Sequence, residues 1–200
     1  MPDHHPQSQE VWLVRHAETE WSLSGKHTGR TDVPLTDAGR ARAHELGARL
    51  GERSFALVLV SPMERARETA SLAGFGDACQ VREDLLEWDY GEYEGITTRE
   101  IRETRPDWYL WTDGVPGGET AEEIGSRCDR IVEEILGVDG DVAIFAHGHV
   151  LRVLAARWVE LPPAAGARLW LSTATISVLG FERETAALRR WNAPVRREQA

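Results

Sequence analysis

Three short apolar segments constrain the fold of this chain more than any other feature. They are Val11–Val14, Ala56–Val60 and Val142–Ala146, and each is a continuous run of hydrophobic residues. Runs of this length are typical of strands buried on both faces, as in parallel sheets. Segments with helical patterns separate them, and residues 173–181 and 187–191 resemble a final pair of strands. This alternation predicts an α/β fold, a three-layer α/β/α sandwich with a mostly parallel central sheet.

Helix boundaries follow from capping residues. Thr36 precedes an Ala-, Arg- and Leu-rich segment, which predicts a helix over 37–50. Two capping boxes, Ser61 with Glu64 and Thr120 with Glu123, predict helices over 62–73 and 121–136. A further helix is expected over 149–159. The polar residues 17–35 resemble a long loop, which in a compact domain usually serves function.

Composition limits the class of protein. A chain of 200 residues suits one domain, here 10–195, after a polar tail over 1–9 that we expect to be disordered. The net charge of −10 argues against nucleic acid and anionic membranes as partners. No signal peptide or membrane span is evident, so a cytoplasmic location is expected. Cys79 and Cys128 lie outside any CxxC motif, which predicts reduced packing residues.

Cationic residues and histidines follow the buried strands. Arg15 and His16 end the first strand, Arg65 lies just after the second, and His147 ends the third. The carboxyl ends of parallel strands form the ligand crevice of open α/β sheets. The sequence therefore predicts a local cationic pocket within an acidic protein.

Such a pocket suits phosphoryl transfer. Arginine forks match phosphate oxygens, and a histidine can act as a covalent nucleophile when a backbone acceptor holds its other ring nitrogen. No Asp-rich cluster accompanies these residues, so no metal and no cofactor is expected. A metal site at His147 and His149 is the alternative. Glu87 is the candidate proton donor among several neighbouring carboxylates.

The motifs, taken together, resemble a known family. They are Arg15-His-Ala-Glu-Thr19, Thr28-Gly29, Pro34-Leu-Thr36, Ser61-Pro-Met-Glu-Arg65-Ala66, Glu87-Trp-Asp-Tyr-Gly91 and His147-Gly148. In this order they resemble the histidine phosphatase (phosphoglycerate mutase-like) superfamily. The resemblance implies that His16 becomes a phosphohistidine, that Arg15, Arg65 and His147 bind the phosphoryl oxygens, and that Glu87 is the proton donor and later the base. It also implies that the substrate side is lined by Ser22, Thr28, Gly29, Tyr90, Gly148 and His149.

Departures from the mutase pattern favour a phosphatase. Ala17 replaces the usual glycine, Ser22 stands where mutases usually carry asparagine, and the segment between Glu87 and His147 is short. The motifs are more similar to acid phosphatases and sedoheptulose-bisphosphatase-like members. The expected function is therefore metal-independent hydrolysis of phosphomonoesters of small metabolites, sugar phosphates among them. A phosphoglycerate mutase and an inactive phospho-ligand binding module are the alternatives.

Two further questions stay open in the sequence. The aromatic residues Trp88, Tyr90, Tyr93, Trp108 and Trp111 form either a packed lid or a wall that faces the substrate. The terminal strands offer an edge for a homodimer, although no residue pattern requires one.

Overall fold

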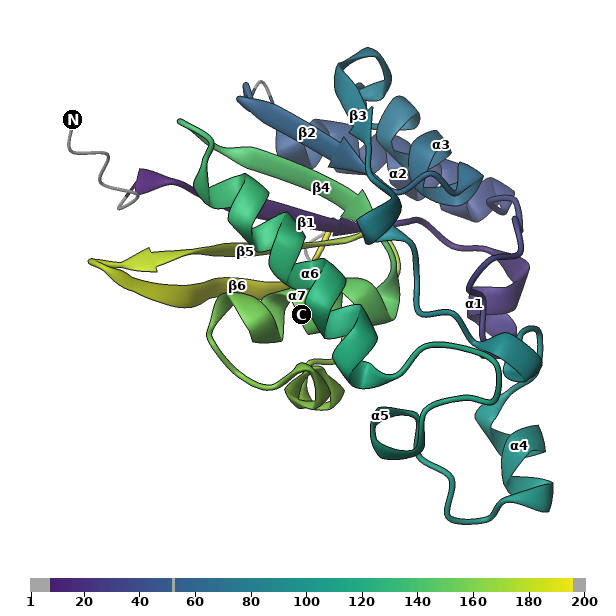
Figure 1. Cartoon of the computed structure of the whole chain (residues 1–200). Helices are drawn as coiled ribbons and strands as arrows, with labels where there is room; N and C mark the ends of the chain where they lie inside the picture. The colour runs from purple at the N-terminus through teal and green to yellow at the C-terminus, as the bar shows by residue number, and fades with distance from the viewer. Residues whose placement is uncertain (1–7, 52, 196–200) are drawn as a thin grey trace, which may run out of the picture.

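A six-stranded sheet forms the centre of the protein in the computed structural model, which describes residues 8–51 and 53–195. The strand order is β3-β2-β4-β1-β5-β6 (Figure 1). The first four strands in the chain are parallel, and β5 and β6 are antiparallel to their neighbours. The strands are β1 (Val11–Arg15), β2 (Leu57–Val60), β3 (Cys79–Val81), β4 (Val142–Ala146), β5 (Thr175–Glu182) and β6 (Thr185–Pro194).

Helices cover both faces of this sheet (Figure 1). On β1, Val11 and Leu13 belong to the core under α6 (Ala121–Leu136) and α7 (Gly148–Trp158). The alternate residues Trp12 and Val14 belong to the core under α2 (Asp37–Leu50) and α3 (Glu64–Leu72). A strand buried on both faces needs apolar residues at every position, which explains the continuous runs. The predicted three-layer α/β/α sandwich is confirmed.

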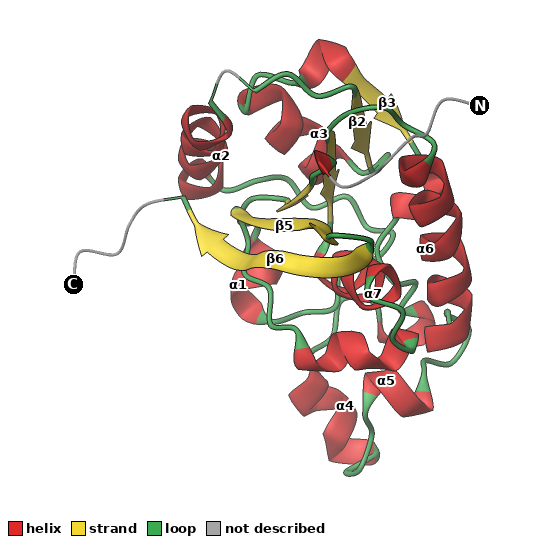
Figure 2. Ribbon diagram, turned by 90° about the vertical axis from the view of Figure 1, so that its left-hand side faces the viewer, coloured by secondary structure: helices red, strands yellow, loops and turns green. Residues whose placement is uncertain are grey.

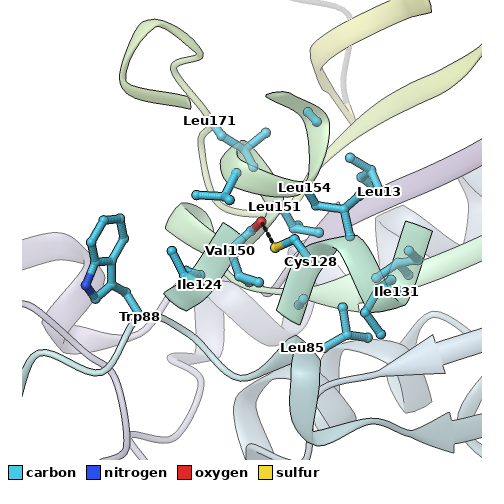
Figure 3. Close-up of a cluster of buried hydrophobic side chains, with 14 of the residues drawn as sticks. Leu13, Leu85, Trp88, Ile124, Cys128, Ile131, Val150, Leu151, Leu154 and Leu171 are labelled. Carbon is cyan, nitrogen blue, oxygen red and sulfur yellow. Dashed lines mark hydrogen bonds between the residues drawn. The ribbon is translucent and has the colours of Figure 1, made fainter. Parts of the chain in front are cut away.

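Both cysteines are free and serve packing. Cys128 lies on α6 in the larger core, and its Sγ is 3.7 Å from the carbonyl oxygen of Val150 (Figure 3). Burial raises the pKa of the Cys128 thiol to about 12 and that of the half-buried Cys79 to about 11. Neither thiol is therefore ionised at neutral pH, and the packing prediction is confirmed.

Shorter helices lie outside the sandwich. These are α1 (Glu20–Ser24), α4 (Thr98–Thr104) and α5 (Leu110–Asp113), and α4 and α5 form one extremity of the molecule (Figure 2). The loop predicted over 17–35 thus contains a helix. A capping box between Thr19 and Ser22 starts it, and Gly25 ends it in the left-handed conformation. Short 3₁₀ segments cover Gly76–Ala78, Glu83–Leu85, Gly91–Tyr93 and Pro163–Arg168.

The capping box predicted at Ser61 is wrong. Helix α3 begins at Glu64, with Met63 as its N-cap and no side-chain cap. The Ser61 hydroxyl instead lies 2.7 Å from Nε2 of His147. The second box is confirmed, because Thr120 and Glu123 cap α6 reciprocally.

The structure also differs from the prediction at one edge of the sheet and near the N-terminus. Strand β3 was not predicted, because only three residues form it and two of them are exposed. Gln9, in the predicted disordered tail, is buried, and its amide nitrogen lies about 3 Å from three carbonyl oxygens. Residues 1–7 of that tail, with His4 and His5, lie outside the described residues. The domain limits 10–195 and the homodimer stay predictions.

No helix within the described ranges is long and apolar enough to cross a membrane.

Candidate active site

A pocket of about 500 Å³ opens where β1 and β4 end. Arg15 at the end of β1 and the adjacent His16 line it, together with Glu87 from the segment before α4. Gly148 and His149 contribute the first residues of α7. Three of the residues predicted to be catalytic therefore share one cavity, as parallel strand ends allow.

His16 is oriented by its own backbone. Its Nδ1 lies 2.7 Å from the carbonyl oxygen of Ala17, and the side chain is only 5% exposed. Since a carbonyl can only accept, Nδ1 carries the proton and Nε2 keeps its lone pair. Burial lowers the pKa of His16 well below its usual value, and the charges of Arg65 and Arg15 lower it further. The ring is therefore neutral at pH 7 and can act as a nucleophile through Nε2.

Arg15 presents an unpaired donor. Its Nη1 donates to the carbonyl oxygen of Leu171, which fixes the guanidinium. Its buried Nε lacks a hydrogen-bond partner among the described residues. A buried donor without a partner is costly, because it loses its hydrogen bond to water. An anionic oxygen beside His16 would satisfy it.

Glu87 lies at the N-terminus of α7. Its carboxylate accepts three backbone N–H bonds of 2.9 Å each, from Trp88, His149 and Val150. Burial raises the pKa of Glu87, but hydrogen bonds to its carboxylate, from His149 above all, outweigh burial and hold the pKa well below the usual value. The carboxylate is therefore ionised in the free site.

Arg65 and His147 lie behind the pocket wall and are fully buried. Arg65 donates from Nη1 to the Thr31 carbonyl and from Nη2 to the carbonyls of Thr28 and Gly29. The His147 ring lies 5.2 Å from the His16 ring, centroid to centroid. Neither is among the residues that line the pocket, so their contact with the phosphoryl oxygens stays a prediction.

Five of the six predicted substrate-side residues line the pocket: Ser22, Thr28, Tyr90, Gly148 and His149. The sixth, Gly29, is buried, and its N–H donates to both oxygens of Glu94, at 2.9 and 3.0 Å. Its amide is therefore occupied and does not face the substrate side as predicted.

Tyr90 and His149 form a pair at the pocket surface. The Tyr90 hydroxyl lies 2.6 Å from Nδ1 of His149. Burial and the charge of Glu87 raise the pKa of Tyr90 well above its usual value, so the hydroxyl keeps its proton and donates a hydrogen bond to Nδ1 of His149. In the neutral imidazole the other nitrogen, Nε2, then carries hydrogen.

The alternative metal site is not supported by these contacts. Both ring nitrogens of His147 are engaged, Nδ1 with Arg65 and Nε2 with Ser61. In the part of the chain that the structure describes, no group of three or more His, Cys, Asp or Glu side chains is placed to hold a metal ion.

Several side chains besides the predicted catalytic ones line the pocket. Tyr90, Trp108 and Trp111 are buried and also line the cavity, so the aromatic cluster is both packing and wall. Arg152 lines it too, and its position three residues after His149 on α7 was the available signal. Lys26 and Arg102 come from segments without a motif and gave no signal.

Comparison with known proteins indicates one family. Residues 11–194 match the model of the histidine phosphatase superfamily, branch 1. An acid phosphatase of Mycobacterium tuberculosis is 46% identical over 174 residues, covering 85% of each chain. A sedoheptulose 1,7-bisphosphatase of Saccharomyces cerevisiae is 37% identical, covering 74% of this chain and 67% of the relative. The solved structure of the open reading frame Rv3214 from Mycobacterium tuberculosis superimposes with a TM-score of 0.86 at 40% identity, covering 94% of this chain and all of that one.

Proposed function

Because the chain belongs to the histidine phosphatase superfamily, we propose that it is a metal-independent phosphatase that hydrolyses phosphomonoesters of small metabolites through a phosphohistidine at His16. The observation that carries this proposal is the hydrogen bond of 2.7 Å between His16 Nδ1 and the Ala17 carbonyl. It leaves Nε2 as a neutral nucleophile in a pocket that also holds Arg15 and Glu87. Relatives named acid phosphatase and sedoheptulose bisphosphatase favour hydrolysis and include sugar phosphates among the candidate substrates.

In the first step, the lone pair of His16 Nε2 attacks phosphorus and the bond to the leaving oxygen breaks. The unpartnered Nε–H of Arg15 donates to a phosphoryl oxygen and stabilises the charge that develops there. Arg65, which is fully buried next to the pocket, adds positive charge near the phosphoryl group. The products are phosphohistidine and an alkoxide, which needs one proton to leave as the alcohol.

Glu87 supplies that proton. The free carboxylate is ionised, but a bound phosphate dianion raises the pKa of a neighbouring carboxyl group and favours its protonation. In the second step the carboxylate of Glu87 takes a proton from water, the hydroxide attacks phosphorus and the P–N bond breaks. Inorganic phosphate leaves, and His16 returns to its neutral form.

We also place the protein in the cytoplasm, with a small phosphorylated metabolite as its partner. The two free thiols support a reducing compartment.

The test is capture of the intermediate. A brief reaction with ³²P-labelled substrate should give acid-labile, base-stable phosphate on His16, and His16→Ala should give none. His44→Ala, which removes an exposed histidine on α2, is the matched control. Phosphate release should continue in the presence of a chelator, and its strict loss would refute the metal-free mechanism. Transfer of the label to a second hydroxyl of phosphoglycerate rather than to water would identify a mutase.

A further inference from the structure

The pocket holds more positive charge than one phosphoryl group requires. Its lining includes Arg15, Lys26, Arg102 and Arg152, and Glu87 is its one carboxylate within the described residues. The protein as a whole carries a net charge of −10, so this concentration of cations is local. None of the ion pairs between described residues includes Lys26, Arg102 or Arg152.

Arg152 is held rigidly in this unpaired state. Its Nε donates to the Gly166 carbonyl at 3.0 Å, and its Nη2 donates to the Ala167 carbonyl at 3.1 Å. Its guanidinium carbon lies 4.7 Å from the centre of the Trp111 ring. A Cβ on Gly166 would come within 2.9 Å of Trp111 and 3.0 Å of the Arg152 backbone, so glycine permits this packing. The side chain is thus preorganised, and the pocket's carboxylate, Glu87, is bound by three backbone N–H groups and forms no ion pair with it.

The position of Arg152 separates it from the reacting end. Arg15, which precedes His16 directly, supplies the buried unpartnered Nε for the phosphoryl group that is transferred. Arg152 lies three residues beyond His149 on α7, about 4.5 Å further along the helix axis. It therefore faces a more distant part of a bound substrate.

Two further cations line the part of the pocket formed by α1, α4 and the segments beside them. Arg102 on α4 donates from Nε to the Trp108 carbonyl at 3.0 Å. Lys26, two residues after α1, lies with its Nζ 5.6 Å from the centre of the Trp21 ring. Both side chains are thus held beside aromatic residues of the same cavity.

We propose that the substrate carries a second anionic group, a phosphate or a carboxylate, which binds Arg152 with Lys26 and Arg102 contributing charge, while the ester at His16 is cleaved. This inference rests on the proposed function and names its substrate class. Guanidinium groups bind both anions in a bidentate manner, and the missing counter-charge would then come from the substrate.

Matched substrate pairs test it. The first pair is fructose 6-phosphate with fructose 1,6-bisphosphate, and the second is glycerol 3-phosphate with 3-phosphoglycerate. At low ionic strength, kcat/KM should favour the member with the second anion by about tenfold or more in at least one pair. A preference in the first pair alone identifies phosphate as the second anion, and a preference in the second alone identifies carboxylate.

Variants locate the effect. Arg152→Gln should remove most of that preference, and the double variant Lys26→Gln/Arg102→Gln should reduce it. Arg152→Lys, which keeps the charge, should retain part of it. The control is Arg99→Gln, which removes an exposed cation of α4 and should keep the preference intact. Equal kcat/KM values for the two members of each pair would overturn the proposal. An equal loss of kcat/KM for both members of a pair in Arg152→Gln would overturn it as well.

A binding measurement separates this inference from the proposed function. Titration calorimetry on His16→Ala, which cannot turn the ester over, should show at least tenfold tighter binding of the member with two anions. If the wild type hydrolyses no ester, 4-nitrophenyl phosphate included, the proposed function fails while this binding result still decides the second-anion site. Equal affinities within both pairs would refute the site.

Discussion

The Nε of Arg65 lies 3.1 Å from Nδ1 of His147, and both side chains are fully buried although 82 positions separate them in the chain. Since the guanidinium can only donate, Nδ1 accepts, and the neutral His147 ring carries its hydrogen on Nε2. That nitrogen lies 2.7 Å from the Ser61 hydroxyl. One contact therefore fixes the tautomer of His147 and ties α3, which follows β2, to the end of β4.

Arg65→Lys should damage both stability and catalysis. Lysine keeps the charge but cannot reach three carbonyls and His147 at once, so buried acceptors lose their partners. We expect the free energy of unfolding to fall by about 3 kcal/mol and kcat/KM to fall by about a hundredfold. Urea titration and initial rates measure these effects. Arg67→Lys, on the exposed face of α3, is the control, and equal effects in the two variants would contradict the assigned role of Arg65.

Stability should fall as the pH drops below neutral. Burial, followed by the charge of Arg65, lowers the pKa of His16 and of His147 well below 6.5. Below pH 6.5 these histidines bind protons in the unfolded chain but not in the folded protein, so the protein loses the stability it has above that pH. Each should cost about 1.4 kcal/mol between about pH 7.5 and pH 5.5. Glu87, whose pKa is also lowered, adds a further loss below about pH 4.5, its ordinary value.

Urea midpoints at pH 7.5, 6.5 and 5.5 measure this dependence. His16→Gln should flatten it, and His44→Gln controls for the loss of an exposed imidazole. A midpoint that does not change between pH 7.5 and 5.5 would argue against neutral buried histidines.

Glu87→Gln should affect poor leaving groups more than good ones. An alkoxide needs a proton to leave, whereas 4-nitrophenolate leaves without one. For an alkyl phosphate such as glycerol 3-phosphate we expect kcat to fall by about 10² to 10⁴, and for 4-nitrophenyl phosphate by less than about tenfold. Glu92→Gln, an exposed neighbour, is the control. Equal losses for the two substrates would indicate that Glu87 acts only by binding α7.

The sequence predicts this sandwich well because each buried strand is a run of apolar residues, and because Arg15 and His16 directly follow one of them. It predicts less about what lies around the strand ends. Arg65 does not line the pocket, and its guanidinium donates to the carbonyls of Thr28, Gly29 and Thr31. Those carbonyls belong to a loop whose path depends on the distant Glu94. Such contacts between remote segments leave no local pattern.

The same limit applies to Arg152. Its spacing from His149 on α7 indicates only which side of the helix it lies on, and the distant segment of Gly166 and Ala167 gives it a fixed position. A short edge strand such as β3 is equally hard to predict, since three residues carry no periodicity.

The two predicted capping boxes offer a direct comparison, because their sequences are alike and their structures differ. Thr120 caps α6 through Glu123, so Thr120→Ala should lower the free energy of unfolding by about 1 kcal/mol with little change in kcat/KM. Ser61 caps no helix and contacts His147, which lies beside His16. Ser61→Ala should therefore reduce kcat/KM by about tenfold or more, since His147 loses a fixed partner. Urea titration and kinetics on both variants measure the contrast. If Ser61→Ala lowers stability but leaves kcat/KM unchanged, the hydroxyl has a structural role alone. The contact with His147 would then play no part in the reaction.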